Sequence, residues 1–299
     1  MSAAEVVRAG AGIHQVLIAT DFSHQSELVV AYGLAFARLL GAQAEIAYAL
    51  PGQEYVLAGG DSLQPGRDAA RRDLQELQRR LRRNSRYDDN TQIRVCLLEG
   101  PAADKLLECA SCDHADLMVV GTHGRGGFAK VFLGSVAEKV FRHSSVPVLT
   151  IGPNLRPRHG PVELRHILAP SDRTARSHPA VKFASELAES HHSWLTVLHV
   201  VEPPTEGTKP DPERVKAGIR DSLAEVVGPE GKRLDIRYRV ESGRVASTIL
   251  DVAAELDADL IVLGVRPSAG VLDRFMWPIA YELLREATCP VLTLRGCGS

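Results

Sequence analysis

Residues 116–151 read DLMVV GTHGRGGFAKVFLGS VAEKVFRHSS VPVLTI, and the fold can be worked out from this stretch. Residues 116–120 are a short, mostly apolar run closed by Gly121, which is typical of a strand buried on both faces of a parallel sheet. A glycine-rich loop follows, and Gly134-Ser135 then opens a segment whose apolar residues recur at helical spacing. The order strand, loop, helix, strand predicts a phosphate-binding turn at the carboxyl edge of a parallel sheet.

The loop contains four glycines within seven residues: Gly121, Gly124, Gly126 and Gly127. Glycine lowers the stability of a chain, so this density indicates a need for positive φ or for close approach of a ligand. The unpaired N–H groups at the start of the next helix are a ready anion site. Ser135 alone has a second interpretation, because Ser135-x-x-Glu138 matches a capping box in which the serine hydroxyl caps its own helix.

The length of 299 residues favours two domains, which we place at 1–155 and 156–299. Apolar strand-like runs alternate with amphipathic helical runs, which predicts an α/β fold. The net charge of −2 does not call for nucleic acid or an anionic membrane as a partner. The N-terminus lacks a signal-peptide pattern and no apolar run approaches the roughly 20 residues of a membrane span, so we expect a cytoplasmic protein.

The second half of the chain repeats the first. Residues 16–21 match residues 167–172 at an offset of 151, as from Asp21 to Asp172, and residues 147–150 match residues 290–293 at an offset of 143. The second copy keeps Gly264 in place of Gly121 but changes the rest of the loop: Pro267 for Gly124, Trp277 for Gly134 and Pro278 for Ser135. Because proline lacks an N–H and an indole fills space, we expect the second loop to have lost phosphate binding, with Pro278 at the start of its helix.

The first apolar strand, residues 16–19, ends in Thr20-Asp21-Phe22-Ser23. Ser23 is placed to cap the following helix, and Gly41 lies where a C-terminal cap belongs. Asp21 has two interpretations: its carboxylate closes the turn through backbone bonds, or it contacts a ligand at the carboxyl edge of the sheet. A second strand is expected at 44–50, and the Gly-, Gln- and Pro-rich connection after it could cover a bound ligand.

Other motifs favour no further chemistry. The arginine-rich residues 68–83 have few aromatic neighbours in a slightly acidic chain, so we expect a solvated helix face. Cys109-x2-Cys112 lacks a second ligand pair for zinc, so we expect helix-packing thiols and no metal site. No P-loop lysine is present, and the match of Gly124-x-Gly126-x-x-Ala129 to a dinucleotide fingerprint follows a late strand, so we discount NAD. No catalytic residues accompany the loop.

The spacing Gly121-x2-Gly124-x9-Gly134-Ser135 resembles the nucleotide-binding signature of the ATP-binding branch of the universal stress proteins. The early ATDFS and the closing VPVLTI fit the same family, and the resemblance covers nearly the whole chain twice. It implies two tandem Rossmann-like (adenine nucleotide alpha hydrolase-like) domains, each a five-stranded parallel sheet with helices on both faces. It also implies one ATP, accompanied by Mg²⁺, in the first domain. The residues that it places at the nucleotide are Ala19, Thr20, Asp21, Ala49, Val120, Gly121, His123, Gly124, Arg125, Gly134, Ser135 and Val136.

The function implied by the resemblance is a stress-response sensor or regulator that binds ATP, with at most weak ATPase activity. A slow ATP hydrolase and a nucleotide-independent interaction scaffold remain alternatives. Universal stress proteins usually dimerise through the closing strand, so we expect strands at 146–151 and 290–294 to pair across the two domains. A homodimer also stays open, whereas we expect neither nucleic acid nor membrane as a partner.

Overall fold

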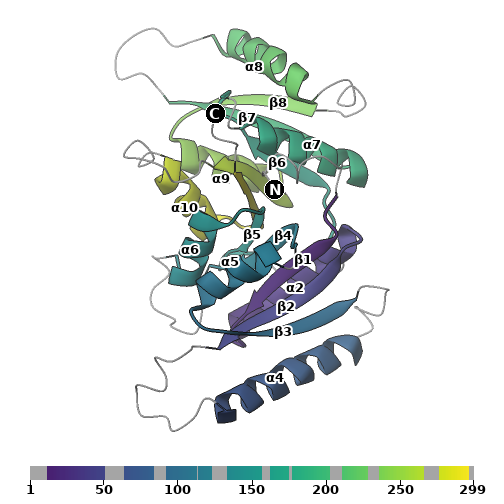
Figure 1. The fold of residues 1–299 in the computed structure, drawn as a ribbon. Coiled ribbons are helices and arrows are strands. Elements are labelled where there is room, and N and C mark those ends of the chain that lie inside the picture. The colour runs from purple at the N-terminus through teal and green to yellow at the C-terminus, as the bar shows by residue number, and fades with distance from the viewer. Residues whose placement is uncertain are drawn as a thin grey trace. The chain divides into compact units, whose positions relative to one another are not determined.

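The computed structural model describes residues 12–50, 64–83, 92–112, 114–122, 133–156, 162–174, 177–202, 211–227, 236–265 and 276–295. These residues form two compact units. One spans residues 13–151, and the other comprises residues 152–156 together with those from 163 onward. In both units strands and helices alternate along the chain (Figure 1), which confirms the predicted α/β class.

The first unit has strands β1 (Gln15–Thr20), β2 (Gln43–Leu50), β3 (Ile93–Glu99), β4 (Leu117–Gly121) and β5 (Val148–Ile151), and helices α2 (His24–Leu39), α4 (Gln64–Arg83), α5 (Ala102–Cys112) and α6 (Ser135–His143). Its described strands form a parallel sheet in the order β3-β2-β1-β4-β5. Helices α2 and α4 cover one face, and α5 and α6 pack together on the other. Both faces are therefore covered, which explains the apolar strands.

The second unit has strands β6 (His166–Pro170), β7 (Trp194–Val201), β8 (Ile236–Ser242), β9 (Leu260–Val265) and β10 (Val291–Arg295), and helices α7 (His178–His191), α8 (Pro212–Val227), α9 (Val245–Glu255) and α10 (Met276–Glu286). Its described strands are parallel in the order β8-β7-β6-β9-β10. Helices α7 and α8 contact each other, as do α9 and α10. The topology of the first unit is thus repeated, as the sequence repeat predicts.

The ends of α2 follow the sequence prediction. Ser23 is the N-cap, and its hydroxyl accepts the N–H of Ser26 at 3.2 Å. At the other end Gly41 has a φ of +65°, and the N–H of Ala42 reaches back to the carbonyl of Ala37 at 2.8 Å. This is a Schellman arrangement, in which a left-handed glycine satisfies the last carbonyl groups of the helix.

An aspartate before the fourth strand of each unit ties that strand to the first. Asp116 Oδ2 accepts the backbone N–H groups of residues 14–15 at 2.7 and 3.0 Å. Asp259 Oδ2 does the same for residues 165–166 at 2.6 and 2.8 Å. The sequence analysis placed Asp116 inside the strand, but β4 begins at Leu117. The carboxylate of Asp116 instead accepts backbone N–H groups at the start of β1.

Two histidines of the second unit should make its stability depend on pH. Burial, and then the charge of Arg237, lower the pKa of His166 below its usual value. Burial, and then His192, lower the pKa of His191. The unfolded chain therefore binds more protons than the folded one, so stability is expected to be full above about pH 6.5 and to fall as the pH drops further.

Urea unfolding at pH values from about 7 down to about 5 checks this prediction, because both histidines titrate in or below that window. Carboxylates also titrate at the lower end, so the comparison is with His166→Gln/His191→Gln, in which the decline should be shallower. An equally steep decline in the double variant would contradict the assignment.

Candidate functional site

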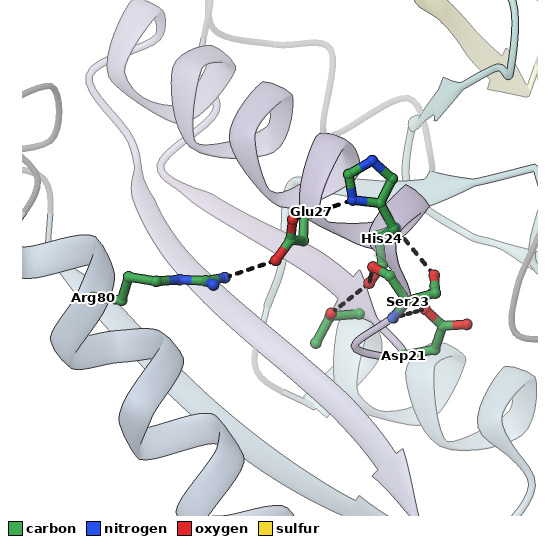
Figure 2. Close-up of polar contacts among 7 residues, drawn as sticks. Asp21, Ser23, His24, Glu27 and Arg80 are labelled. Carbon is green, nitrogen blue, oxygen red and sulfur yellow. Dashed lines mark hydrogen bonds and ion pairs between the residues drawn. The ribbon is translucent and has the colours of Figure 1, made fainter.

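The turn that follows β1 is closed by Asp21. Asp21 Oδ1 accepts the N–H of Ser23 at 3.0 Å and the Ser23 hydroxyl at 2.6 Å (Figure 2). Phe22 lies between them with a φ of +59°, and its N–H donates to Thr20 Oγ1 at 3.2 Å. The turn-closing interpretation of Asp21 is confirmed, and these bonds hold its carboxylate at the carboxyl end of β1.

The second unit repeats this turn with different side chains. Asp172 Oδ1 accepts the N–H of Thr174 at 3.0 Å and its hydroxyl at 2.7 Å, and Arg173 has a φ of +61°. The N–H of Arg173 donates to Ser171 Oγ at 3.2 Å. The turn is therefore part of the framework in both units, and a difference in function between them must come from other residues.

One backbone hydrogen bond joins the two described ends of the glycine loop, residues 121–134, and a second joins its first end to β5. The N–H of Gly134 donates to the carbonyl of Thr122 at 2.7 Å, and the N–H of Thr122 donates to the carbonyl of Ile151 at 3.2 Å. Thr122 is fully buried. His123, Gly124 and Arg125 lie outside the described residues. Sequence reasoning missed Thr122, because its role depends on Ile151, which lies far along the chain.

Helix α6 begins directly after the glycine loop, with Gly134 as its N-cap. Gly134 has φ −60° and ψ 146°, and among the described residues no side chain forms a capping hydrogen bond to the helix. Ser135 is the first helical residue and is exposed, while Glu138 pairs with Arg142 at 2.9 Å. The capping-box interpretation of Ser135 is therefore wrong, because the serine lies one residue past the cap. With no side-chain cap, the first-turn N–H groups of α6 have the character of an anion site.

Small apolar side chains lie beside this helix start. Ala19 and Val136 pack against the core cluster that contains Val120, on the face covered by α5 and α6. Ala49 is half-buried and, by alternation along β2, faces the same side as Ala47 of that cluster. Thr20 instead bonds Ser26 of α2 at 3.1 Å. The structure thus gathers Ala19, Val120 and Val136 in one cluster, puts Ala49 on the same face, and turns the hydroxyl of Thr20 to the opposite face.

Phe22 of the Asp21 turn forms an aromatic pair with Tyr48 of β2, on the face of the sheet that α4 covers. The ring centroids of Phe22 and Tyr48 are 4.7 Å apart and the rings are tilted by 49°. Both pack against the cluster that includes Ala70 and Leu74 of α4. This packing fixes the end of β2, and with it the position of Ala49.

The helix start of the second unit differs from that of the first. At the offset of 143, Ser135 aligns with Pro278, yet α10 begins at Met276 and Pro278 is its third residue. Pro278 thus lies in the first turn of α10, as expected, two residues after the helix begins. A proline is tolerated in the first turn because its missing N–H has no partner there. The backbone of Trp277 is thus helical where that of the aligned Gly134 is extended.

The arginine-rich helix α4 carries ion pairs on its surface. Arg80 pairs with Glu27 of α2 at 3.2 Å, and Glu27 also lies 3.6 Å from His24 (Figure 2). The side chains of Arg80 and Arg79 are 61% and 66% exposed. Pairs this exposed contribute little to stability, in keeping with a solvated helix face.

Cys109 and Cys112 both lie on α5, as predicted, with Cys109 buried and Cys112 exposed. In the part of the chain that the structure describes, no group of three or more His, Cys, Asp or Glu side chains is arranged to hold a metal ion. Over the same residues, no helix has both the length and the apolar character that crossing a bilayer requires.

Comparison with known proteins places these features in a family. The family model described as the universal stress protein family matches residues 12–152 and again residues 163–295. A universal stress protein of Methanocaldococcus jannaschii is 27% identical over 148 residues, which cover 49% of this chain and 86% of the relative. Universal stress protein A homolog 1 of Coxiella burnetii is 31% identical over 139 residues, covering 44% of this chain and 95% of the relative.

A solved structure also matches nearly the whole chain. A universal stress protein from Archaeoglobus fulgidus superposes with a TM-score of 0.71 at 18% identity, over 94% of this chain and 96% of that one. At this identity the match speaks for the fold alone, which is that of two Rossmann-like domains. The two family matches together span most of the sequence, one in each unit. The chain therefore belongs to the universal stress protein family and carries the family domain twice in tandem.

Proposed function

We propose that the first domain binds one ATP at the carboxyl edge of its sheet, and that the chain acts as a stress-response sensor or regulator through this occupancy. The observation that carries the proposal is the start of α6. Gly134 caps the helix without a side chain, and its own N–H is committed to Thr122 at 2.7 Å. The next N–H groups of the first turn suit the phosphates of a nucleotide.

The remaining predicted residues supply the other parts of the site. The adenine packs near Ala49 and Asp21, where the turn bonds of Asp21 hold its carboxylate in place. The ribose and the first phosphates follow Gly121, His123, Gly124 and Arg125, where glycine allows close approach and the basic side chains donate charge-assisted bonds.

The terminal phosphates of the ATP rest on Gly134, Ser135 and Val136. The Ser135 hydroxyl suits this role because it lies past the cap, is exposed and bonds no other described residue. Ala19 and Val120 belong to the apolar packing beside the helix start and offer no polar group to compete for the phosphates. The proposed site therefore binds the phosphates mainly through backbone N–H groups and depends on few side chains.

Mg²⁺ accompanies the triphosphate in this proposal. Mg²⁺ keeps several waters and binds through substrate phosphates, with at most one or two carboxylates from the protein. The described residues near α6 fit that requirement, since they offer N–H and hydroxyl groups for phosphate rather than an acidic cage. The chain's own residues would hold the nucleotide, and the nucleotide would hold the cation.

The test is to identify any nucleotide that co-purifies with the full chain, and to titrate the nucleotide-free protein with ATP and Mg²⁺ by calorimetry. We expect an adenine nucleotide in the extract and one ATP bound per chain. Steady phosphate release would favour the slow hydrolase instead. Protein that carries no adenine nucleotide and takes up none would contradict the proposal and favour the scaffold.

A further inference from the structure

The residues that directly follow β5 pack against the second unit, to which they belong. We call residues 152–156 the clamp segment. Gly152 is buried, and a Cβ added there would lie 3.1 Å from the carbonyl oxygen of Leu284 near the end of α10. The clamp segment therefore passes α10 at a distance that only glycine permits without a shift.

Two polar residues fasten the clamp segment. Asn154 Nδ2 donates to the carbonyl of Arg285 at 3.1 Å, in the last turn of α10, where carbonyl groups lack helical partners. The N–H of Arg156 donates to the carbonyl of Thr288 at 3.0 Å, and its guanidinium pairs with the carboxylate of Asp257, just after α9. The segment is thus bonded to the ends of two helices of the second unit.

The other end of the clamp segment is joined to the base of the glycine loop. Gly152 follows Ile151, whose carbonyl accepts the N–H of Thr122, and the carbonyl of Thr122 accepts the N–H of Gly134. Ile151 also pairs with Gly121 in the sheet register. The path from the cap of α6 to the clamp segment therefore consists of two backbone hydrogen bonds and one peptide bond.

We propose that the clamp segment couples nucleotide occupancy of the first domain to the second domain, with the bound nucleotide favouring the docked clamp. This inference rests on the proposed function, since the ligand is the nucleotide placed at the glycine loop. Phosphates held at the start of α6 fix Gly134, and Gly134 fixes Thr122 and Ile151. A fixed Ile151 leaves less freedom to Gly152, so docking of the segment costs less conformational entropy.

Thermodynamic linkage makes the coupling reciprocal. If the nucleotide stabilises the docked clamp, then loosening the clamp weakens nucleotide binding by the same factor. The effect is therefore expected at a site in the first domain when the substitution is made in the second.

The experiment measures both directions on the full chain with ATP and Mg²⁺. Hydrogen exchange at the amides of Gly152, Asn154, Leu155 and Arg156 is expected to slow by about fivefold or more when ATP is bound. By calorimetry, Arg156→Ala and Asp257→Asn are each expected to weaken ATP binding by about 2-fold to 30-fold. Asp257 has a φ of +48°, a conformation that asparagine also accepts, so Asp257→Asn removes the charge without backbone strain.

Arg165→Ala is the matched control, because the side chain of Arg165 is 70% exposed and its ion pair with Glu163 is long, at 4.0 Å. It should bind ATP like the wild type. If Arg156→Ala does not fold, the ATP affinity of Asp257→Asn alone tests the coupling. Wild-type binding together with unchanged affinity in the variants and unchanged exchange would overturn the coupling alone. Failure of the wild type to bind ATP would overturn both the coupling and the proposed function.

Discussion

Replacing Gly134 with tryptophan is expected to weaken ATP binding by about 100-fold or more while leaving the fold intact. Gly134 has φ −60° and ψ 146°, a conformation open to any residue, so the backbone need not change. The indole would lie at the start of α6, where the proposed terminal phosphates rest. Losing two charge-assisted bonds, each worth about 1.5–3 kcal/mol, weakens binding by about 100-fold or more. Calorimetric titration with ATP and Mg²⁺ measures the loss.

The matched control for this variant is Lys139→Trp. It adds the same indole about one turn further along α6, at an exposed position paired with Asp104 of α5. We expect Lys139→Trp to bind ATP as the wild type does, and thermal unfolding should show both variants folded. Unchanged affinity in Gly134→Trp would overturn the placement of the nucleotide.

The second domain provides the reverse comparison. Trp277→Gly restores the glycine of the first domain but leaves Pro278 in place and α10 starting at Met276. We therefore expect it to gain no tight second site, and the titration should still give one ATP per chain. Two tight sites in the wild-type protein would show that the second loop has kept its function.

Asp259→Ala is expected to destabilise the second unit by about 3–5 kcal/mol. Asp259 is 4% exposed, and its Oδ2 accepts the N–H groups of Arg165 and His166 at 2.6 and 2.8 Å. Alanine would leave both donors without this acceptor at the start of β6. The only two tryptophans of the chain, Trp194 and Trp277, lie in the second unit, so their fluorescence during urea unfolding reports on it.

Asp116→Ala is the counterpart in the first unit and should have a smaller effect. Asp116 is half-buried, and its bond to the N–H of His14 lies at the exposed end of the strand, so water can replace the lost acceptor. The tryptophan transition should hardly move, while circular dichroism shows a loss of about 1–2 kcal/mol. An Asp259→Ala transition that coincides with that of the wild type would contradict the role assigned to this tie.

Much of the architecture could be predicted from local sequence patterns. Ser23 and Gly41 mark the ends of α2 because caps depend on residues within one turn of the helix. The glycine loop was located between a strand and a helix because apolar period and glycine density both change there. The repeat at offsets of 151 and 143 predicts two copies of one topology, and each copy has the same strand order.

Parts of the candidate site needed the structure. The capping box at Ser135 failed because a four-residue pattern does not say which residue takes the extended cap conformation; here it is Gly134. The exact position of Pro278 within the first turn of α10 also needed the structure, because proline is accepted at several positions of a first turn. The hydrogen-bond partners of Asp116 could not be predicted from the sequence, since the N–H groups that it accepts lie 102 and 101 residues earlier in the chain.

The sequence by itself determined the α/β class, the duplication and the position of the glycine loop, because periodicity, caps and repeats are properties of neighbouring residues. Only the tertiary structure decided which distant groups share hydrogen bonds. Thr122 joins Gly134 to Ile151, and Asn154 reaches the carbonyl of Arg285, 131 residues away. These bonds join backbone and side-chain groups that are brought near each other only by the topology of the fold, so a local sequence pattern cannot predict them.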